Sequence, residues 1–188
     1  MMMNDDWKLD EEEKNEALND DDKEFDDEFL FDNKHFNTLV VHQKSDENAN
    51  SKKQVLDVEK FIALYQNPSE KNELLQWLKE NNYKTLLIEQ IQENQDEDIL
   101  TKLVCAYWEA GFDDEKDLMI FIPFLLSNNF NLVLEANSAI MGLARPFDET
   151  DTQKAIQMIE GAYNDLSSDT IVLIDEILEL LKSNLSNE

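Results

Sequence analysis

The sequence predicts an all-α fold, with a helical domain over residues 51–188 behind an acidic tail and linker over residues 1–50. From Gln54 onward, apolar residues recur at intervals of three and four, which is the period of an amphipathic helix. The chain of 188 residues has only three glycines, too few for the turn chemistry of an all-β protein. Acidic side chains outnumber basic ones by 43 to 16, which gives a net charge of −27.

The tail comes first. Residues 1–32 hold 15 acidic side chains against three lysines, and such like charges repel each other and bury little, so we expect this segment to be disordered. The short run Phe36 to His42 has the composition of a strand. An isolated strand without a partner is not stable, so we expect no stable strand there, and we interpret Gln43 to Lys53 as a polar linker.

Helix-boundary signals then divide the rest of the chain. Asn67-Pro68-Ser69-Glu70 has the pattern of a capping box, Gly111 suits the left-handed cap at a helix end, and Asp113 and Asp114 suit the start of the next helix. Thr150-Asp151-Thr152-Gln153 is a second capping box. These signals predict eight helices, near 54–66, 69–81, 83–94, 97–110, 114–127, 131–144, 151–165 and 168–184.

The helices group into pairs. Their connecting loops centre near Pro68, Asp96, Asn129 and Ser168, at intervals of 28, 33 and 39 residues, and periods of this length are typical of stacked repeats. A compact bundle with short loops is the alternative. Stacked pairs would form one continuous core, and we expect it to bury Leu125, Ala136, Ile140, Ile156, Ile159, Ile174 and Leu178.

The third pair, residues 121–143, carries a resemblance to a known family. Phe121-Ile122-Pro123-Phe124-Leu125-Leu126, then Val133-Leu134-Glu135-Ala136 and Ala139-Ile140-Met141-Gly142-Leu143, resembles a HEAT or armadillo-type repeat, with Pro in the first helix and small residues in the second. Asn129-Phe130 stands where that family has Asp-Pro, and Leu134 where it has Arg. The resemblance implies a short right-handed α-solenoid of about four helix pairs, in which Ala136, Ala139 and Gly142 allow close helix approach. It also implies a protein-binding function and transfers no catalytic residue.

The sequence argues against enzymatic and cofactor-binding functions. No Gly-rich loop and no Gly-Lys-Ser/Thr step occur, so a phosphate-binding loop is absent. No Gly precedes Gly111, so the acidic runs of the tail contain no EF-hand loop. We therefore expect no cofactor and no metal site. His35 and His42 are the only histidines and lie outside the helical domain, so that domain has no histidine base. We interpret Cys105, on an apolar helix, as a small buried hydrophobic residue.

Charge and hydropathy limit location and partners. A single Arg and one Lys52-Lys53 pair argue against direct nucleic-acid binding. The longest apolar run, Leu118 to Leu126, is too short to span a membrane, the first ten residues lack signal-peptide features, and one Cys cannot form an intramolecular disulfide. We therefore expect a cytoplasmic protein without membrane attachment. Its acidity favours a basic protein partner.

Two groups of aromatic residues are candidate anchors for such a partner. The tail carries Phe25, Phe29 and Phe31 among its acids, and segments of this kind can fold onto a partner groove. The second group lies near the ends of helices. Most aromatic residues in such places pack in the core, but Trp often anchors protein interfaces. The candidates in this group are Trp77, Trp108 and Phe130.

We therefore expect a non-enzymatic interaction module, a HEAT-like scaffold or adaptor that binds a basic protein. The alternative is an acidic inhibitor or immunity-type protein that blocks a basic enzyme such as a nuclease. The effect on the partner separates the two hypotheses, because an inhibitor abolishes the partner's activity and a scaffold leaves it intact. Oligomeric state does not follow from the sequence.

Overall fold

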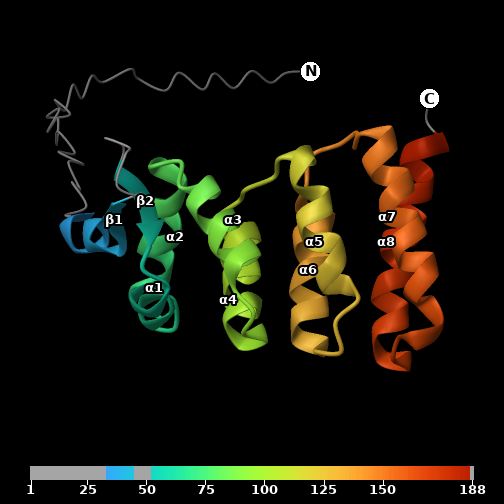
Figure 1. The fold of residues 1–188 in the computed structure, drawn as a ribbon, viewed down its shortest axis with the longest axis horizontal. Coiled ribbons are helices and arrows are strands. Elements are labelled where there is room, and N and C mark those ends of the chain that lie inside the picture. Colours follow the sequence, from blue (N-terminus) through green and yellow to red (C-terminus); the bar gives the residue numbers. More distant parts are fainter. Residues whose placement is uncertain (1–32, 45–51, 187–188) are drawn as a thin grey trace, which may run out of the picture. The chain divides into compact units, whose positions relative to one another are not determined.

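The protein is mostly helical, as the sequence predicts. A computed structural model describes residues 33–44 and 52–186, which belong to one contact unit, Asp32–Glu188. The expected disorder of residues 1–32 lies outside the described residues. Within them, the α-helices shown in Figure 1 are α1 Val58–Tyr65, α2 Lys71–Glu80, α3 Lys84–Glu93, α4 Glu97–Glu109, α5 Leu118–Leu125, α6 Phe130–Gly142, α7 Glu149–Ala162 and α8 Ser168–Ser186.

A two-stranded sheet precedes the helices and corrects two expectations. Strand β1, Val40–Lys44, pairs antiparallel with β2, Lys52–Leu56, in a register that sets Val40 opposite Leu56. The run near residue 40 therefore does have a partner strand, and the first helix begins at Val58 rather than at residue 54. The reason is local, since Asp57 caps α1 by accepting a hydrogen bond from the Lys60 amide, which leaves residues 52–56 free to extend.

The expected domain boundary at residue 50 also needs correction. Phe36 and Leu39, in the 3-10 helix η1 (Asn33–Leu39), are completely buried. The Phe36 ring lies 5.8 Å from the Trp77 ring of α2, and η1 contacts both α1 and α2. A short run of apolar residues within a polar stretch thus contributes to the core, so the helical unit includes residues 33–44.

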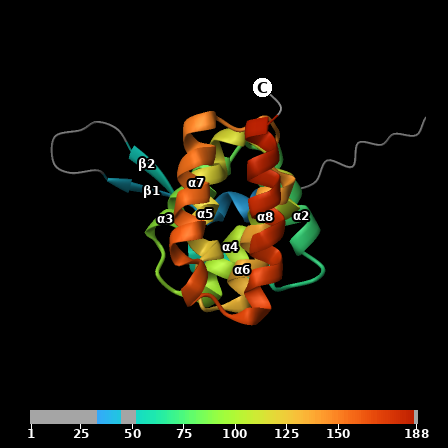
Figure 2. The ribbon, with the colours of Figure 1, turned by 90° about the vertical axis from the view of Figure 1, so that its right-hand side faces the viewer.

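The helices are arranged in two layers of adjacent pairs. Helix α3 packs on α4, α5 on α6 and α7 on α8, and Figure 2 shows the last pair side by side. Helices α4, α6 and α8 contact each other in series, and α5 contacts α7 in the other layer. Helix α1 contacts both α2 and α4. The core lies between the layers and includes Leu103, Tyr107, Phe121, Ile140 and Ile174, all completely buried.

Most of the predicted core positions are confirmed. Leu125, Ala136, Ile140, Ile159, Ile174 and Leu178 are buried, and Ile156 is half-buried against the core. Ala136 and Ala139 of α6 are completely buried in the core. Gly142 is exposed, and a Cβ added there would meet no atom within 4 Å. The expectation that Gly142 permits close helix approach is therefore wrong, because it sits on the solvent side at the end of the helix.

The helix boundaries follow capping chemistry. Gly111 has a φ of +73°, as predicted for the turn that ends α4. The predicted capping box at 67–70 does not start α2, which begins at Lys71 after Glu70 and has no side-chain cap. Asn67 instead accepts a hydrogen bond from the Ser69 amide in the turn before the helix. Helix α7 begins earlier than expected, because its cap is Asp148, which accepts from the Asp151 amide, and not Thr150. Asp114 caps η2, Glu115–Asp117, a 3-10 turn that leads into α5.

Candidate partner-binding surface

Two of the predicted anchors lie on neighbouring exposed helix surfaces. Trp108, near the end of α4, and Phe130, at the start of α6, keep 36% and 45% of their surface exposed. The Trp108 indole donates a hydrogen bond from Nε1 to Oε2 of Glu135 on α6, over 2.8 Å. This bond holds a large apolar side chain at the junction of the two helices while leaving part of it in contact with solvent.

Helix α6 exposes two further apolar side chains that the sequence analysis missed. Leu134 and Met141 are 39% and 46% exposed. At about 100° per residue, positions 130, 134 and 141 fall within about 40° of one another, so the three side chains share one side of α6. The sequence could have indicated them, because both are apolar residues of α6 that lie outside the buried stripe formed by Leu132, Val133, Ala136 and Ile140.

Trp77 belongs to the core instead. It is only 1% exposed, and its ring packs 4.8 Å from Tyr83 and 5.8 Å from Phe36. A buried ring offers no surface to a partner, so the expectation that Trp77 anchors one is corrected. The expected tail anchors Phe25, Phe29 and Phe31 lie outside the described residues.

A hydrogen-bonded cluster forms around Glu109, the residue that follows Trp108 on α4. The Tyr65 hydroxyl, at the end of α1, donates to Oε2 of Glu109 over 2.6 Å. Lys71, at the start of α2, lies 2.8 Å from both carboxylate oxygens of Glu109 and 4.6 Å from the Tyr65 ring centre. Burial raises the pKa of Tyr65, and the nearby thiol and carboxylate raise it further. Tyr65 therefore stays neutral, and the cluster fastens α1 and α2 to the end of α4.

Cys105 lies on the same exposed side of α4 and is half-buried rather than fully buried. Burial raises the pKa of Cys105 to about 12; the hydrogen bond with Tyr65 opposes this increase, and Glu135 and Glu109 add to it. A nucleophilic cysteine requires the thiolate. At neutral pH this side chain is a thiol, so it contributes apolar surface between Tyr65 and Glu135.

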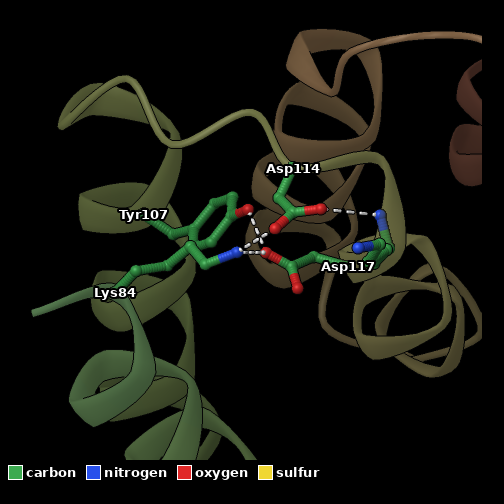
Figure 3. A network of polar contacts seen from close by, with 5 residues as sticks. Lys84, Tyr107, Asp114 and Asp117 are labelled. Atoms are coloured by element: carbon green, nitrogen blue, oxygen red, sulfur yellow. Dashed lines mark hydrogen bonds and ion pairs between the residues drawn. The ribbon is translucent and has the colours of Figure 1, made fainter. Parts of the chain in front are cut away.

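The most buried polar network joins two helix pairs and is shown in Figure 3. Nζ of Lys84, on α3, lies 2.6 Å from Asp114 and 3.0 Å from Asp117. The Tyr107 hydroxyl, on α4, donates to the same Asp117 oxygen over 2.6 Å. Asp114 also accepts a hydrogen bond from the Lys116 amide. The network thus links α3 and α4 to the turn that begins α5.

The protonation states in this network follow from its geometry. Burial disfavours the charged form of Lys84, but hydrogen bonds from Lys84 to Asp114 and Asp117 outweigh it and raise the lysine pKa. Burial, and then the hydrogen bond to Asp117, raise the pKa of Tyr107, while the Lys84 hydrogen bond lowers the pKa of Asp114. Lys84 is thus charged and Tyr107 neutral at physiological pH. The arrangement braces the packing of the pair α5–α6 against the pair α3–α4.

The exposed side of the layer α4–α6–α8 is acidic. These helices carry eight acidic side chains and two lysines, Lys102 and Lys182. Lys182 lies 2.8 Å from Glu160 of α7, which directs its charge away from α6. Within the described ranges, no group of three His, Cys, Asp or Glu side chains comes together as metal ligands would. No helix in this part of the chain is both long and apolar enough to cross a membrane.

Comparisons with protein-family models, with curated proteins and with solved structures each find no match to this chain.

Proposed function

We propose that this chain is a non-enzymatic protein-binding module, a short α-solenoid of HEAT-like helix pairs that binds a basic protein partner. One observation carries the proposal. Trp108, Phe130, Leu134 and Met141 are exposed on adjoining helices that also carry most of their charge as carboxylates. Partner sites are typically apolar at the centre and polar at the rim, with Trp among the residues that contribute most to affinity.

The order of helix contacts supports the solenoid part of the proposal. In a stack of helix pairs, each second helix packs on the second helix of the next pair. Helices α4, α6 and α8 contact one another in this order, and α5 contacts α7. The resemblance of residues 121–143 to a HEAT repeat points to the same arrangement, with Pro123 inside α5 and buried Ala136 and Ala139 in α6.

Charge sets the expected class of partner and the manner of association. A net charge of −27 repels other acidic proteins and attracts basic ones, and this attraction raises association rate and selectivity more than affinity. The apolar side chains would supply most of the affinity. In the full chain, Phe25, Phe29 and Phe31 of the acidic tail would add a second set of apolar contacts.

The test is affinity capture of a partner from the native cell, followed by titration of the purified pair at low and high salt. Trp108→Ala with Phe130→Ala should weaken binding by at least about tenfold. Val41→Ala is the matched control, because Val41 is also 36% exposed but lies on β1, away from α4 and α6. Changing Phe25, Phe29 and Phe31 to Ala tests the tail separately. Binding that ignores salt and all these changes would contradict the proposal.

A further inference from the structure

We propose that the exposed side of α6 and α8 binds a basic amphipathic helix of the partner. This inference rests on the proposed function and specifies the form of its ligand. The surface, called here the α6–α8 face, consists of apolar side chains from both helices beside carboxylates of α8, and its members are Phe130, Leu134, Met141, Val172, Asp169 and Glu176.

One hydrogen bond fixes how the two helices meet. Nδ2 of Asn137 on α6 donates to the Leu173 carbonyl oxygen on α8 over 2.9 Å. Leu134 and Met141 lie about one turn to either side of Asn137, so both face the stretch of α8 around Leu173. Val172, the most exposed of the large apolar side chains in the described part of the chain, precedes Leu173 in α8. The hydrogen bond therefore brings the exposed side of α6 close to the stretch of α8 that carries Val172.

The carboxylates on this face are available to a ligand. Asp169 and Glu176 lie about one turn before and after Val172, and both are exposed. Glu176 has no hydrogen bond or ion pair to any side chain that the structure describes, and neither has Glu179, one turn further along. The nearest lysine on α8, Lys182, is paired with Glu160 on α7. A cation from outside can therefore meet Glu176 without displacing an internal partner, whereas Asp169 accepts a hydrogen bond from the Ser168 hydroxyl over 3.4 Å.

The dimensions of the face suit a helical ligand. Phe130 and Met141 are eleven residues apart on α6, so the apolar row extends over about 16 Å, or about three helical turns. A helix laid along this row can place apolar residues at intervals of three and four against it, as helix-in-groove complexes do. Its basic residues on the α8 side would then reach Asp169 and Glu176.

Charge argues against the other possible occupants. A second copy of the chain would bring another net charge of −27 to an acidic surface, and residues 1–32 of the chain itself carry a net −12. Both would be repelled, whereas a cationic helix gains attraction along one edge and apolar burial along the other. The chemistry of the face therefore favours a helix with Leu-like residues on one side and Lys or Arg on the other.

The experiment measures binding of a synthetic Leu/Lys peptide to the full chain by fluorescence anisotropy at about 0.15 M salt. The peptide has about 18 residues, with Leu at helical spacing on one face. A peptide of the same composition in scrambled order is the charge-matched control. The patterned peptide should bind at least about tenfold more tightly than the scrambled one. Equal binding of the two would show attraction by net charge alone and would overturn the proposal.

Variants of the chain then locate the site. Leu134→Ser with Met141→Ser should weaken binding of the patterned peptide by at least about tenfold, and Glu176→Gln should weaken it by about twofold to fivefold, less at high salt. Val41→Ser and Glu73→Gln are the controls, since both positions are exposed and lie on β1 and α2. Circular dichroism should show unchanged helix content throughout. If Leu134→Ser with Met141→Ser and Glu176→Gln bind the patterned peptide no more weakly than the controls do, the α6–α8 face is not the binding site.

The inference and the proposed function can fail separately. If a captured natural partner depends on Trp108, which lies on α4, but not on Leu134, Met141 or Glu176, the protein-binding function stands and the α6–α8 face is not the helix site. If none of these substitutions weakens binding of the natural partner, the proposed surface is wrong, even if the synthetic peptide binds to it.

Discussion

Replacing Tyr107 by Phe tests whether the network between the helix pairs stabilises the fold. Tyr107 is completely buried, and its ring packs 4.8 Å from Phe121 and 5.5 Å from Phe112. Phe fills the same space, so the change removes the hydroxyl and leaves the ring contacts. What is lost is the 2.6 Å hydrogen bond to Asp117, whose side chain is only 10% exposed.

The expected cost follows from the type of bond. A hydrogen bond to a charged group contributes about 1.5–3 kcal/mol to stability, more than a bond between neutral groups. Asp117 keeps Lys84 as a partner at 3.0 Å, so the change does not leave a buried carboxylate without any partner. We therefore expect Tyr107→Phe to lower the free energy of unfolding by about 1.5–3 kcal/mol and no more.

The assay is equilibrium unfolding in urea at neutral pH, with the midpoint lowered and the slope unchanged. Tyr163→Phe is the matched control. The Tyr163 hydroxyl also donates to a carboxylate, that of Asp175 at 2.8 Å, but at an exposed position where water can replace the lost partner. This control should leave the free energy of unfolding nearly unchanged. If the two variants lose the same stability, burial of the network does not matter and the reasoning fails.

The pH dependence gives an independent check on the same change. The pKa of Tyr107 is raised in the folded state by burial and then by the hydrogen bond to Asp117. A raised pKa contributes stability that is fully present below the unfolded value of about 10 and is lost as pH rises above it, because the unfolded chain ionises first. The stability difference between wild type and Tyr107→Phe should therefore shrink above about pH 10. A difference that grows there would contradict the assignment.

Four further substitutions test the core, the segment that precedes the sheet and the charged edge of the network. Ile140→Ala and Ile174→Ala, both at completely buried positions in the layer of second helices, should each cost about 2–5 kcal/mol in urea unfolding, and a cost below about 0.5 kcal/mol at both would mean that the packing faces are misassigned. Phe36→Ala should cost about 3–5 kcal/mol by the same measurement, because η1 packs on α2, and no effect would restore a domain boundary near residue 50. Asp114→Asn should destabilise less than Tyr107→Phe at neutral pH, because its carboxylate is partly exposed. Lys84 lowers the pKa of Asp114, so the stability from this group is present above the unfolded value of about 4 and is lost as pH falls below it. Acid titration of both proteins should show the difference disappearing, and a constant difference down to low pH would refute the assignment.

Local signals in the sequence were enough for the helices and many of their ends. The spacing of apolar residues from Gln54 onward predicted the helical class, and Gly111 was recognised as the end of α4 because a positive φ favours glycine. Buried positions such as Leu125, Ile140 and Ile174 also followed, since one face of an amphipathic helix turns toward the core. These predictions use information carried by neighbouring residues.

Other features depended on contacts between distant residues. The partner of strand β1 lies beyond the intervening segment 45–51, so neither strand could be recognised alone, and Phe36 gains its buried place only against Trp77. Trp77 and Trp108 are both Trp near the middle or end of helices, yet the first is buried and the second exposed. Nothing in their local sequence distinguishes them, because exposure depends on which helix packs on which side.

By itself, then, the sequence determined the helical class and the acidic character of the chain. Composition and short-range periodicity carry that information. Only the tertiary structure decided which aromatic residues remain at the surface, that Leu134 and Met141 join Phe130 there, and that Lys84, Tyr107 and Asp117 form one network. The physical reason is that burial and pairing are properties of packed helices, and they arise from contacts between residues far apart in the chain.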